Sequence, residues 1–405
     1  MEKIYTERAH LMCPNMNFGI IMSVKAEYNE ASIIKSVTLL SEAPPFLKSL
    51  LGINEDDNSY FYNVTKHSQI KIICKKETIR NINDEIIFDD YTKLTSMEWD
   101  LTQEGMLKVL AYKNNDKTLF LLIFHHLFAD GRGAFMLANE LAACYVSGIK
   151  PCPSLEKLIS TKKGFPKNSK LSFISNLLIK YANKKWIKEN HRVTYKEYLE
   201  LANNFVANNI IERSIQMIID NEYKYITDKC HEKKVSLNDY LISKMIVEKN
   251  TAKVIIACDL RNELECYNHG ALGNYSTAFS IEPKIKTTDI WTLSEKVHTI
   301  VQKKINTPKD LYLILQCYAE LNGNLLDAAF VSSRCGFKSK AAKFIGNLFF
   351  GYSHTAGYSI TNLGKYKSEY IEDGVFIPPV SPAIKQTLGV ITLNGKMVMT
   401  FAERI

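Results

Sequence analysis

The segment that decides the fold of this 405-residue chain runs from Thr118 to Gly131 and reads TLFLLIFHHLFADG. From Thr118 to Phe128 the odd- and even-numbered positions are both apolar, apart from the two histidines. This pattern predicts a strand buried on both faces. The pair Asp130-Gly131 favours a turn, and a helical pattern follows at residues 132–146. The histidines are therefore expected at the end of a central strand, where α/β proteins commonly have their sites.

The two adjacent imidazoles are expected to do different things. Because neighbouring residues on a strand point to opposite faces, His125 and His126 cannot act together on one substrate or chelate one metal ion. One should face a cavity while the other packs inside its lobe. A neutral imidazole titrates near pH 6.5, so the cavity-facing one is a natural general base. On periodicity alone, a pair of hydrogen-bonded core histidines explains the segment equally well.

The rest of the chain alternates strand and helix patterns in both halves. Strands are expected at 17–26, 60–64, 69–74, 107–112, 214–219, 254–258, 276–281, 358–361, 389–393 and 397–401, and helices at 29–42, 222–233, 237–248 and 289–320. The Pro-, Lys- and Ser-rich stretch 150–172 is the best connection between two lobes. The pattern predicts an α/β (α+β) fold with an N-terminal lobe at 1–160 and a C-terminal lobe at 161–405.

Composition narrows the class of protein. With 46% hydrophobic and 23% charged residues the chain is typical of a soluble globular protein. Its nine cysteines are odd in number and lack Cys-x-x-Cys spacing, so neither a disulfide scaffold nor a zinc site is favoured and no metal is expected. The net charge of +8 is spread along the chain, which argues against nucleic-acid binding. It suits a phosphate-bearing small molecule or an acidic protein, although a solvated surface is the simpler explanation.

Targeting signals were sought as well. The N-terminus lacks the apolar core of a secretory signal, and the longest apolar runs are far shorter than the roughly 20 residues that span a bilayer. A cytoplasmic monomer is therefore expected. No nucleophile elbow, phosphate-binding loop or zinc-protease helix motif occurs in the sequence.

The segment His125-His126-x-x-x-Asp130-Gly131 resembles the HHxxxDG signature of the superfamily that includes nonribosomal-peptide condensation domains, chloramphenicol acetyltransferase, and wax-ester and alcohol acyltransferases. Further similar segments are Ala9–Met12, Pro44–Leu47, Asp259-Leu260-Arg261, Gly273-Asn274 and Ser359–Gly364, with Thr361 where the family more often has serine. The resemblance thus extends over most of the chain.

The resemblance implies two similar chloramphenicol-acetyltransferase-like lobes in a V with a tunnel between them. His126 would sit in the tunnel as general base, with His125 in a supporting role. Asp130 would turn away and pair with Arg261 of the other lobe. Gly131 would let the backbone bend close to the tunnel. Backbone N–H groups, with Asn362 as a helper, would face the oxyanion.

The resemblance also implies the reaction. An acyl group would pass from a thioester on phosphopantetheine, either coenzyme A or a separate carrier protein, to the hydroxyl or amine of a small acceptor, with no permanently bound cofactor. The segments around Arg261 and Asn362 look closer to the acyltransferase branch, which favours coenzyme A. Two alternatives remain open: a stand-alone peptide-type condensation enzyme for carrier-bound substrates, and a non-catalytic thioester- or carrier-binding module. For single residues, Asp130 and Asn274 can equally be turn formers without chemistry.

Overall fold

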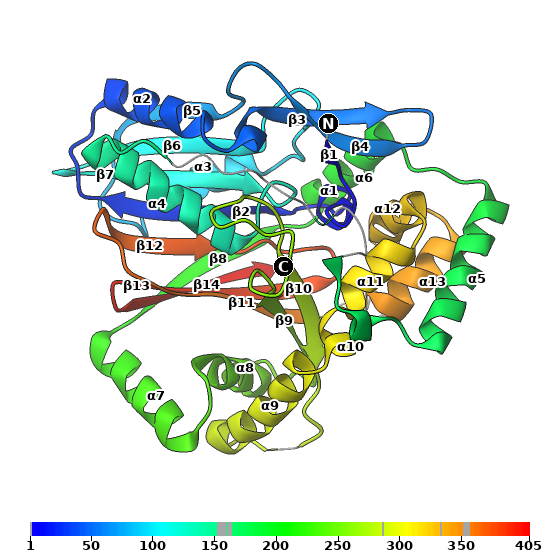
Figure 1. The fold of residues 1–405 in the computed structure, drawn as a ribbon. Coiled ribbons are helices and arrows are strands. Elements are labelled where there is room, and N and C mark those ends of the chain that lie inside the picture. Colours follow the sequence, from blue (N-terminus) through cyan, green and yellow to red (C-terminus); the bar gives the residue numbers. More distant parts are fainter. Residues whose placement is uncertain (1, 152–158, 160–163, 286, 333, 351–356) are drawn as a thin grey trace.

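The computed structural model describes residues 2–151, 159, 164–285, 287–332, 334–350 and 357–405 (Figure 1). Its main frame consists of a five-stranded sheet of order β12-β2-β7-β6-β5 and a six-stranded sheet of order β10-β9-β11-β13-β14-β8. The strands of the first are β12 (Ile371–Ile377), β2 (Asn17–Val24), β7 (Lys117–His125), β6 (Leu107–Asn114) and β5 (Lys71–Thr78). Those of the second are β10 (Ser276–Ile281), β9 (Val254–Asp259), β11 (Gly357–Tyr366), β13 (Ile384–Leu393), β14 (Lys396–Arg404) and β8 (Ile211–Ile218).

Strand β7 is central, as the apolar segment predicts. It pairs antiparallel with β2 on one side and β6 on the other, and its residues from Thr118 to His125 are all buried. The strand ends at His125, three residues earlier than expected, because the Phe128 N–H turns back to the His125 carbonyl at 3.0 Å. His126 therefore lies in the turn rather than in the strand.

Helices cover the five-stranded sheet and its edge. The helix α4 (Gly131–Ser147) packs on β2 and on α2 (Glu30–Ser41), while α3 (Glu85–Leu94) packs on β7. A separate three-stranded sheet is formed by β1 (Glu2–Lys3), β4 (Ser59–Val64) and β3 (Ser49–Asn54). The short helix α1 (Arg8–Leu11) follows β1. The turn after β7 leads directly into α4, so the histidines lie at a strand-to-helix junction.

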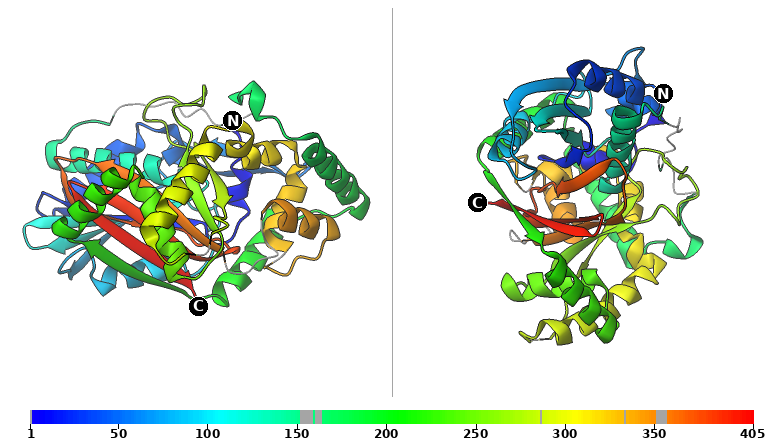
Figure 2. Two further views of the ribbon diagram at one scale, coloured as in Figure 1. Left: turned by 90° about the horizontal axis from the view of Figure 1, so that it is seen from below. Right: turned by 90° about the vertical axis from the view of Figure 1, so that its left-hand side faces the viewer.

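The six-stranded sheet carries its own helices. On the side away from the first sheet lie α7 (Asp220–Lys233), α8 (Leu237–Glu248) and α9 (Ile290–Ile305) (Figure 2). Helix α8 has the predicted bounds, and its capping box, in which Ser236 and Asp239 hydrogen-bond each other's backbone, is present. The helical region expected at 289–320 is present, but it is divided into three helices. Pro308, which has no N–H to donate, begins a new helix, so the region is α9, α10 (Pro308–Leu311) and α11 (Leu313–Glu320).

Several elements escaped the sequence patterns. They are β3, β12, α3, and the helices α5 (Phe173–Glu189), α6 (Tyr195–Ala207), α12 (Gly323–Ser332) and α13 (Lys340–Phe349). Strand β12 is the most consequential, because it comes from the later half of the chain yet pairs with β2, with Val375 opposite Ile21. The two-lobe α/β fold is confirmed, with one strand crossing between its sheets. Most of 150–164 lies outside the described residues, and the boundary at 160 stays a prediction.

A search of the helices in the described ranges found none long and apolar enough to cross a membrane. Eight of the nine cysteines lie in the described ranges. Five of these eight are buried, which is typical of cysteine acting as a small apolar side chain.

Candidate active site

The ring of His126 is held by an amide from the other lobe. Its Nδ1 lies 2.8 Å from Oδ1 of Asn274. The Asn274 Nδ2 donates to the carbonyl oxygens of His126, at 2.7 Å, and Leu127, at 3.1 Å. Because two carbonyls can only accept, the NH₂ end of this amide must face them, and its oxygen must face His126. The imidazole therefore carries its proton on Nδ1, which leaves Nε2 as the lone-pair nitrogen.

The charge state of His126 agrees with a role as base. Burial lowers the pKa of this imidazole below its ordinary 6.5, and the opposing pull of Asp130 and Asn274 does not reverse the shift. The ring is therefore neutral at neutral pH. Its Nε2 has no hydrogen-bond partner among the residues that the structure describes, and the side chain is only half-buried.

Two aromatic rings fix the plane of His126. His10, from α1, stacks on it face to face, with ring centroids 4.2 Å apart and an interplanar angle of 5°. Phe18, from β2, meets the same ring edge-on at 5.2 Å. Together with the amide of Asn274, these contacts leave the imidazole little freedom to rotate. In the sequence, Ala9–Met12 was only a segment similar to the family. The stacking of His10 on His126 could not be predicted from it.

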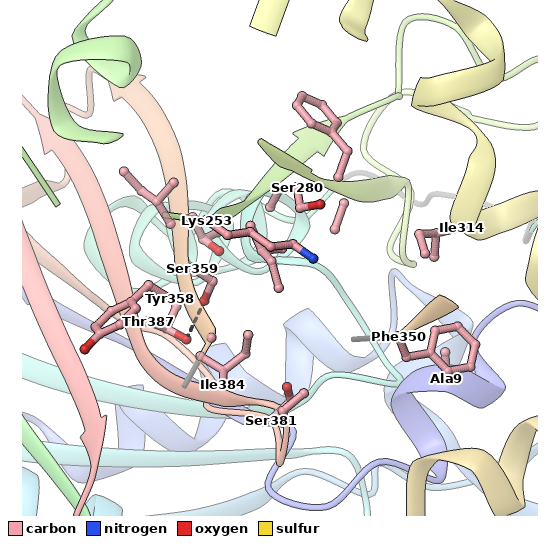
Figure 3. A pocket seen from close by; sticks show the side chains of 18 of the residues that line it. Ala9, Lys253, Ser280, Ile314, Phe350, Tyr358, Ser359, Ser381, Ile384 and Thr387 are labelled. Carbon is pink, nitrogen blue, oxygen red and sulfur yellow. Dashed lines mark hydrogen bonds between the residues drawn. The ribbon is translucent and has the colours of Figure 1, made fainter. Parts of the chain in front are cut away.

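A cavity of about 890 Å³ opens beside this stack. Its walls come from both halves of the chain, at residues 9–16 and between residues 251 and 387, and they are mainly apolar. Figure 3 shows the polar exceptions: the Lys253 amine points into the space, and the hydroxyls of Ser359 and Thr387 bond each other at 2.8 Å. His10 lines the cavity whereas His126 lies behind it. Residues from both halves of the chain thus enclose one cavity, and the tunnel between the lobes stays an expectation.

Asp130 and Arg261 form the predicted contact. Arg261 Nη2 donates to Asp130 Oδ1 at 2.6 Å, and their side chains are only 7% and 6% exposed. The same Asp130 oxygen accepts from the Gly133 N–H at the start of α4, at 2.9 Å. The other carboxylate oxygen accepts from the Tyr275 N–H at 2.9 Å. The carboxylate is thus fully engaged in structure and turned away from His126.

Arg261 is held from its other side as well. Its Nη1 donates to Asp259 Oδ1 at 3.0 Å, and its guanidinium lies 5.3 Å from the centre of the Tyr275 ring. The second oxygen of Asp259 pairs with Arg132 of α4, whose Nε donates to the Leu363 carbonyl at 3.2 Å. The four side chains in this network, Asp130, Arg261, Asp259 and Arg132, alternate in charge. Their contacts join the turn after β7 to β9 and β11.

His125 is the histidine that packs inside. It is 2% exposed, and its Nδ1 accepts from the Leu127 N–H at 3.2 Å. Burial, reinforced by His126 and Lys108, lowers the pKa of His125 to about 3, so it is a neutral core residue. His125 packs inside its lobe, as one of the two histidines was expected to do, whereas His126 lies in the turn after the strand, so strand alternation does not set the direction of its ring.

Gly131 is constrained by packing. A Cβ on it would lie 2.5 Å from the Leu363 side chain and 3.5 Å from Phe376. Both neighbours come from the later half of the chain, so the missing side chain lets the two halves approach closely.

Both ends of the Asn362 amide are engaged by residues other than His126. Its Nδ2 donates to Asn238 at 2.7 Å, and its Oδ1 accepts from the Gly364 N–H at 2.9 Å. Asn274, which in the sequence was part of a segment similar to the family or a turn former, is the amide that contacts His126. The pairing Gly273-Asn274 was noticed in the sequence, but no local pattern links it to a residue 148 positions away. Within the described ranges no group of three or more His, Cys, Asp or Glu side chains is arranged for a metal ion.

Sequence comparison found no matching family profile and no matching curated protein. Solved structures do match. The polyketide synthase associated protein 5 from Mycobacterium tuberculosis is 15% identical, with 100% of this chain and 92% of that chain covered and a TM-score of 0.59. The epimerization domain from the third module of tyrocidine synthetase B is 13% identical, with 98% and 87% covered and a TM-score of 0.57.

A third match is the first condensation domain of the calcium-dependent antibiotic synthetase, in complex with a substrate analogue. It is 9% identical, covers 97% of this chain and 86% of that chain, and has a TM-score of 0.60. At these identities the likeness concerns the fold. The chain has the fold of condensation domains over nearly its whole length.

Proposed function

We propose that this protein is an acyltransferase that moves an acyl group from a phosphopantetheine thioester to a hydroxyl or amine, with His126 as general base. The observation that carries the proposal is the hydrogen bond between His126 and Asn274. It holds the proton on Nδ1 and so leaves Nε2 ready to accept one. A core histidine with no chemistry would not need its second nitrogen free beside a cavity.

The reaction follows from this geometry. Nε2 of His126 takes the proton from the acceptor O–H or N–H as that atom bonds to the thioester carbon. The carbonyl oxygen becomes the oxyanion of a tetrahedral intermediate. The C–S bond then breaks, and the leaving thiolate takes the proton back from the imidazolium. The products are an ester or amide and a free thiol. Asp130 and Arg261 act in this proposal by holding the turn that carries His126.

An activated donor suits this site. A single imidazole can remove a proton, but it does not make a plain carboxylic acid or ester more reactive, so the acyl group should arrive activated. The mainly apolar cavity fits an acyl chain, and the overall charge of +8 suits an anionic donor. We favour coenzyme A, because the segments around Arg261 and Asn362 resemble the acyltransferase branch. We expect a monomer acting in the cytoplasm.

A second candidate is amide formation between substrates held on separate carrier proteins. It is favoured by the matching structures, several of which are condensation or cyclization domains of peptide synthetases. The two candidates share the base and differ in donor and acceptor. A non-catalytic thioester-binding module is the alternative of another class, and the free Nε2 of His126 speaks against it.

The test offers acyl-coenzyme A and acyl-carrier donors of several chain lengths to the purified protein, together with a panel of alcohols and amines. Mass spectrometry of the products and release of free thiol are measured. Turnover with coenzyme A thioesters supports the favoured donor, whereas turnover with carriers alone supports the second candidate. Turnover of unactivated acids or esters, with no thioester consumed, would contradict the proposal. Binding of thioesters without turnover would identify a binding module.

A further inference from the structure

His10 has one buried and one accessible nitrogen. Its Nδ1 is buried without a hydrogen-bond partner among the described residues. The ring as a whole is only partly buried, and it lines the 890 Å³ cavity. The ring edge that faces the cavity therefore carries Nε2. This is the imidazole that stacks on His126 at 4.2 Å, so the stacked pair lies at the wall of the cavity.

The position of the His10 proton follows from these two environments. A neutral imidazole has one N–H, and a buried N–H without an acceptor is rarer in proteins than a buried acceptor without a donor. The proton is therefore favoured on Nε2, where water or a ligand can accept it. Burial and the neighbouring imidazoles His126 and His125 hold the pKa of His10 well below 6.5, so the ring is neutral. The stack thus pairs two neutral imidazoles with opposite roles: His126 offers a lone pair and His10 offers an N–H.

We propose that His10 is a catalytic residue that donates a hydrogen bond from Nε2–H to the thioester carbonyl oxygen and stabilises the oxyanion. This inference rests on the proposed function and adds a residue to it. The attacking atom and the oxyanion are bonded to the same carbon, so their partners must lie close together on one side of the site. Two stacked rings 4.2 Å apart provide an acceptor and a donor at that spacing. An oxyanion donor acts from about 2.7–3.1 Å.

A neutral histidine suits this task. It keeps the N–H on the oxygen throughout the reaction and does not compete with His126 for the substrate proton. Neutral imidazole is known to act as such an electrophile where its pKa is depressed. Because the oxyanion exists only after attack, the bond should strengthen in the transition state and contribute little to substrate binding.

The first test replaces His10 in two ways. His10→Phe keeps an aromatic ring on His126 but has no N–H, whereas His10→Gln places an amide N–H near the former Nε2. We expect His10→Phe to lower kcat about 10²–10³-fold with KM nearly unchanged. We expect His10→Gln to recover a large part of that loss. A non-reacting thioether analogue should bind the His10→Phe and wild-type proteins with the same Kd. Thermal unfolding of both variants checks that the fold is intact.

The outcomes separate this inference from the proposed function. A wild-type kcat in His10→Phe, or an equal loss of kcat in both His10 variants, would overturn the oxyanion role of His10. In either case an inactive His126→Ala protein would still support His126 as the general base. NMR of ¹⁵N-histidine protein gives a readout independent of turnover, since it reports which His10 nitrogen carries the proton. A proton on Nδ1 would overturn the inference whatever the kinetics. If the wild-type protein turns over no thioester, the proposed function fails, and the oxyanion role fails with it.

Discussion

Arg261 lies 131 positions after Asp130 in the chain and donates a 2.6 Å hydrogen bond to its carboxylate. The other oxygen of Asp130 accepts from the Tyr275 N–H, so the carboxylate also holds the segment that follows Gly273. Asn274 belongs to that segment, and its amide orients the His126 ring. The ion pair between Asp130 and Arg261 therefore acts on His126 indirectly. It holds the segment that carries Asn274, and the Asn274 amide determines which ring nitrogen of His126 carries the proton.

Breaking this ion pair should cost stability. Asp130→Ala or Arg261→Ala alone leaves a buried charge without its partner, and each should lower the free energy of unfolding by about 3–5 kcal/mol. The double variant should lose less than the sum of the two, as measured by urea unfolding. The control is the half-buried pair Lys117–Glu372, whose side chains are 32% and 34% exposed and for which a coupling of about 0.2–1 kcal/mol is expected. Equal coupling energies in the two cycles would contradict the structural role of the buried pair.

Removing the candidate base should affect rate more than stability. His126→Ala is expected to lower kcat by about 10²–10⁴-fold with a nearly unchanged Tm, because the side chain is half-buried and acts on a proton. His125→Ala is the control. It removes a fully buried ring and the acceptor of the Leu127 N–H, so it should mainly lower Tm. An active His126→Ala enzyme would refute the assignment.

The pH profile should report the environment of His126. Because burial lowers its pKa, kcat/KM should be constant near neutral pH and fall on the acid side with an apparent pKa below 6.5. Asn274→Asp puts a negative charge beside Nδ1, which favours the imidazolium and should move this acid limb to higher pH. Asn274→Leu, which loses the acceptor without adding charge, should lower kcat about 10–100-fold, as loss of a histidine's orienting partner typically does. An unmoved acid limb in Asn274→Asp would show that the limb belongs to another group.

A buried carboxyl away from the site should make stability depend on pH. Burial raises the pKa of Glu98 to about 7, although one of its oxygens accepts from the Asn15 N–H. In the unfolded chain the carboxyl ionises near 4.5, so the folded state binds the extra proton between these values. Glu98 therefore contributes stability that is fully present below pH 4.5 and is lost as pH rises through 7.

Glu98→Gln tests this dependence, because glutamine keeps the acceptor oxygen and cannot ionise. The free energy of unfolding of the variant should fall less than that of the wild type between pH 5 and 8, measured by urea titration at each pH. The buried His125 acts in the opposite sense, since its pKa of about 3 means that stability is lost as pH falls below 6.5. It is present in both proteins and cancels in the comparison. Parallel pH curves for the two proteins would contradict the prediction.

The sequence by itself determined the buried strand, the turn and the helix around His126, because those elements depend on local alternation and turn chemistry. A strand whose odd- and even-numbered positions are both apolar has to be covered on both faces. Asp130 is the N-cap of the helix that begins at Gly131. The resemblance added the partner Arg261, which the structure places in contact with Asp130. The helical region at 289–320 was predicted, but not its division, because the apolar spacing continues across Pro308, where a backbone donor is missing.

Only the tertiary structure decided which side chains surround the base. Strand β12 joins a sheet from the other half of the chain, and no local pattern encodes that pairing. In the same way His10, His126 and Asn274 come from three separate regions, and their contacts exist only after the lobes have packed. Periodicity gives the face on which a residue lies, whereas a tautomer depends on the partner that packing brings to each ring nitrogen. Here packing gave His126 an acceptor on one nitrogen and left the other free.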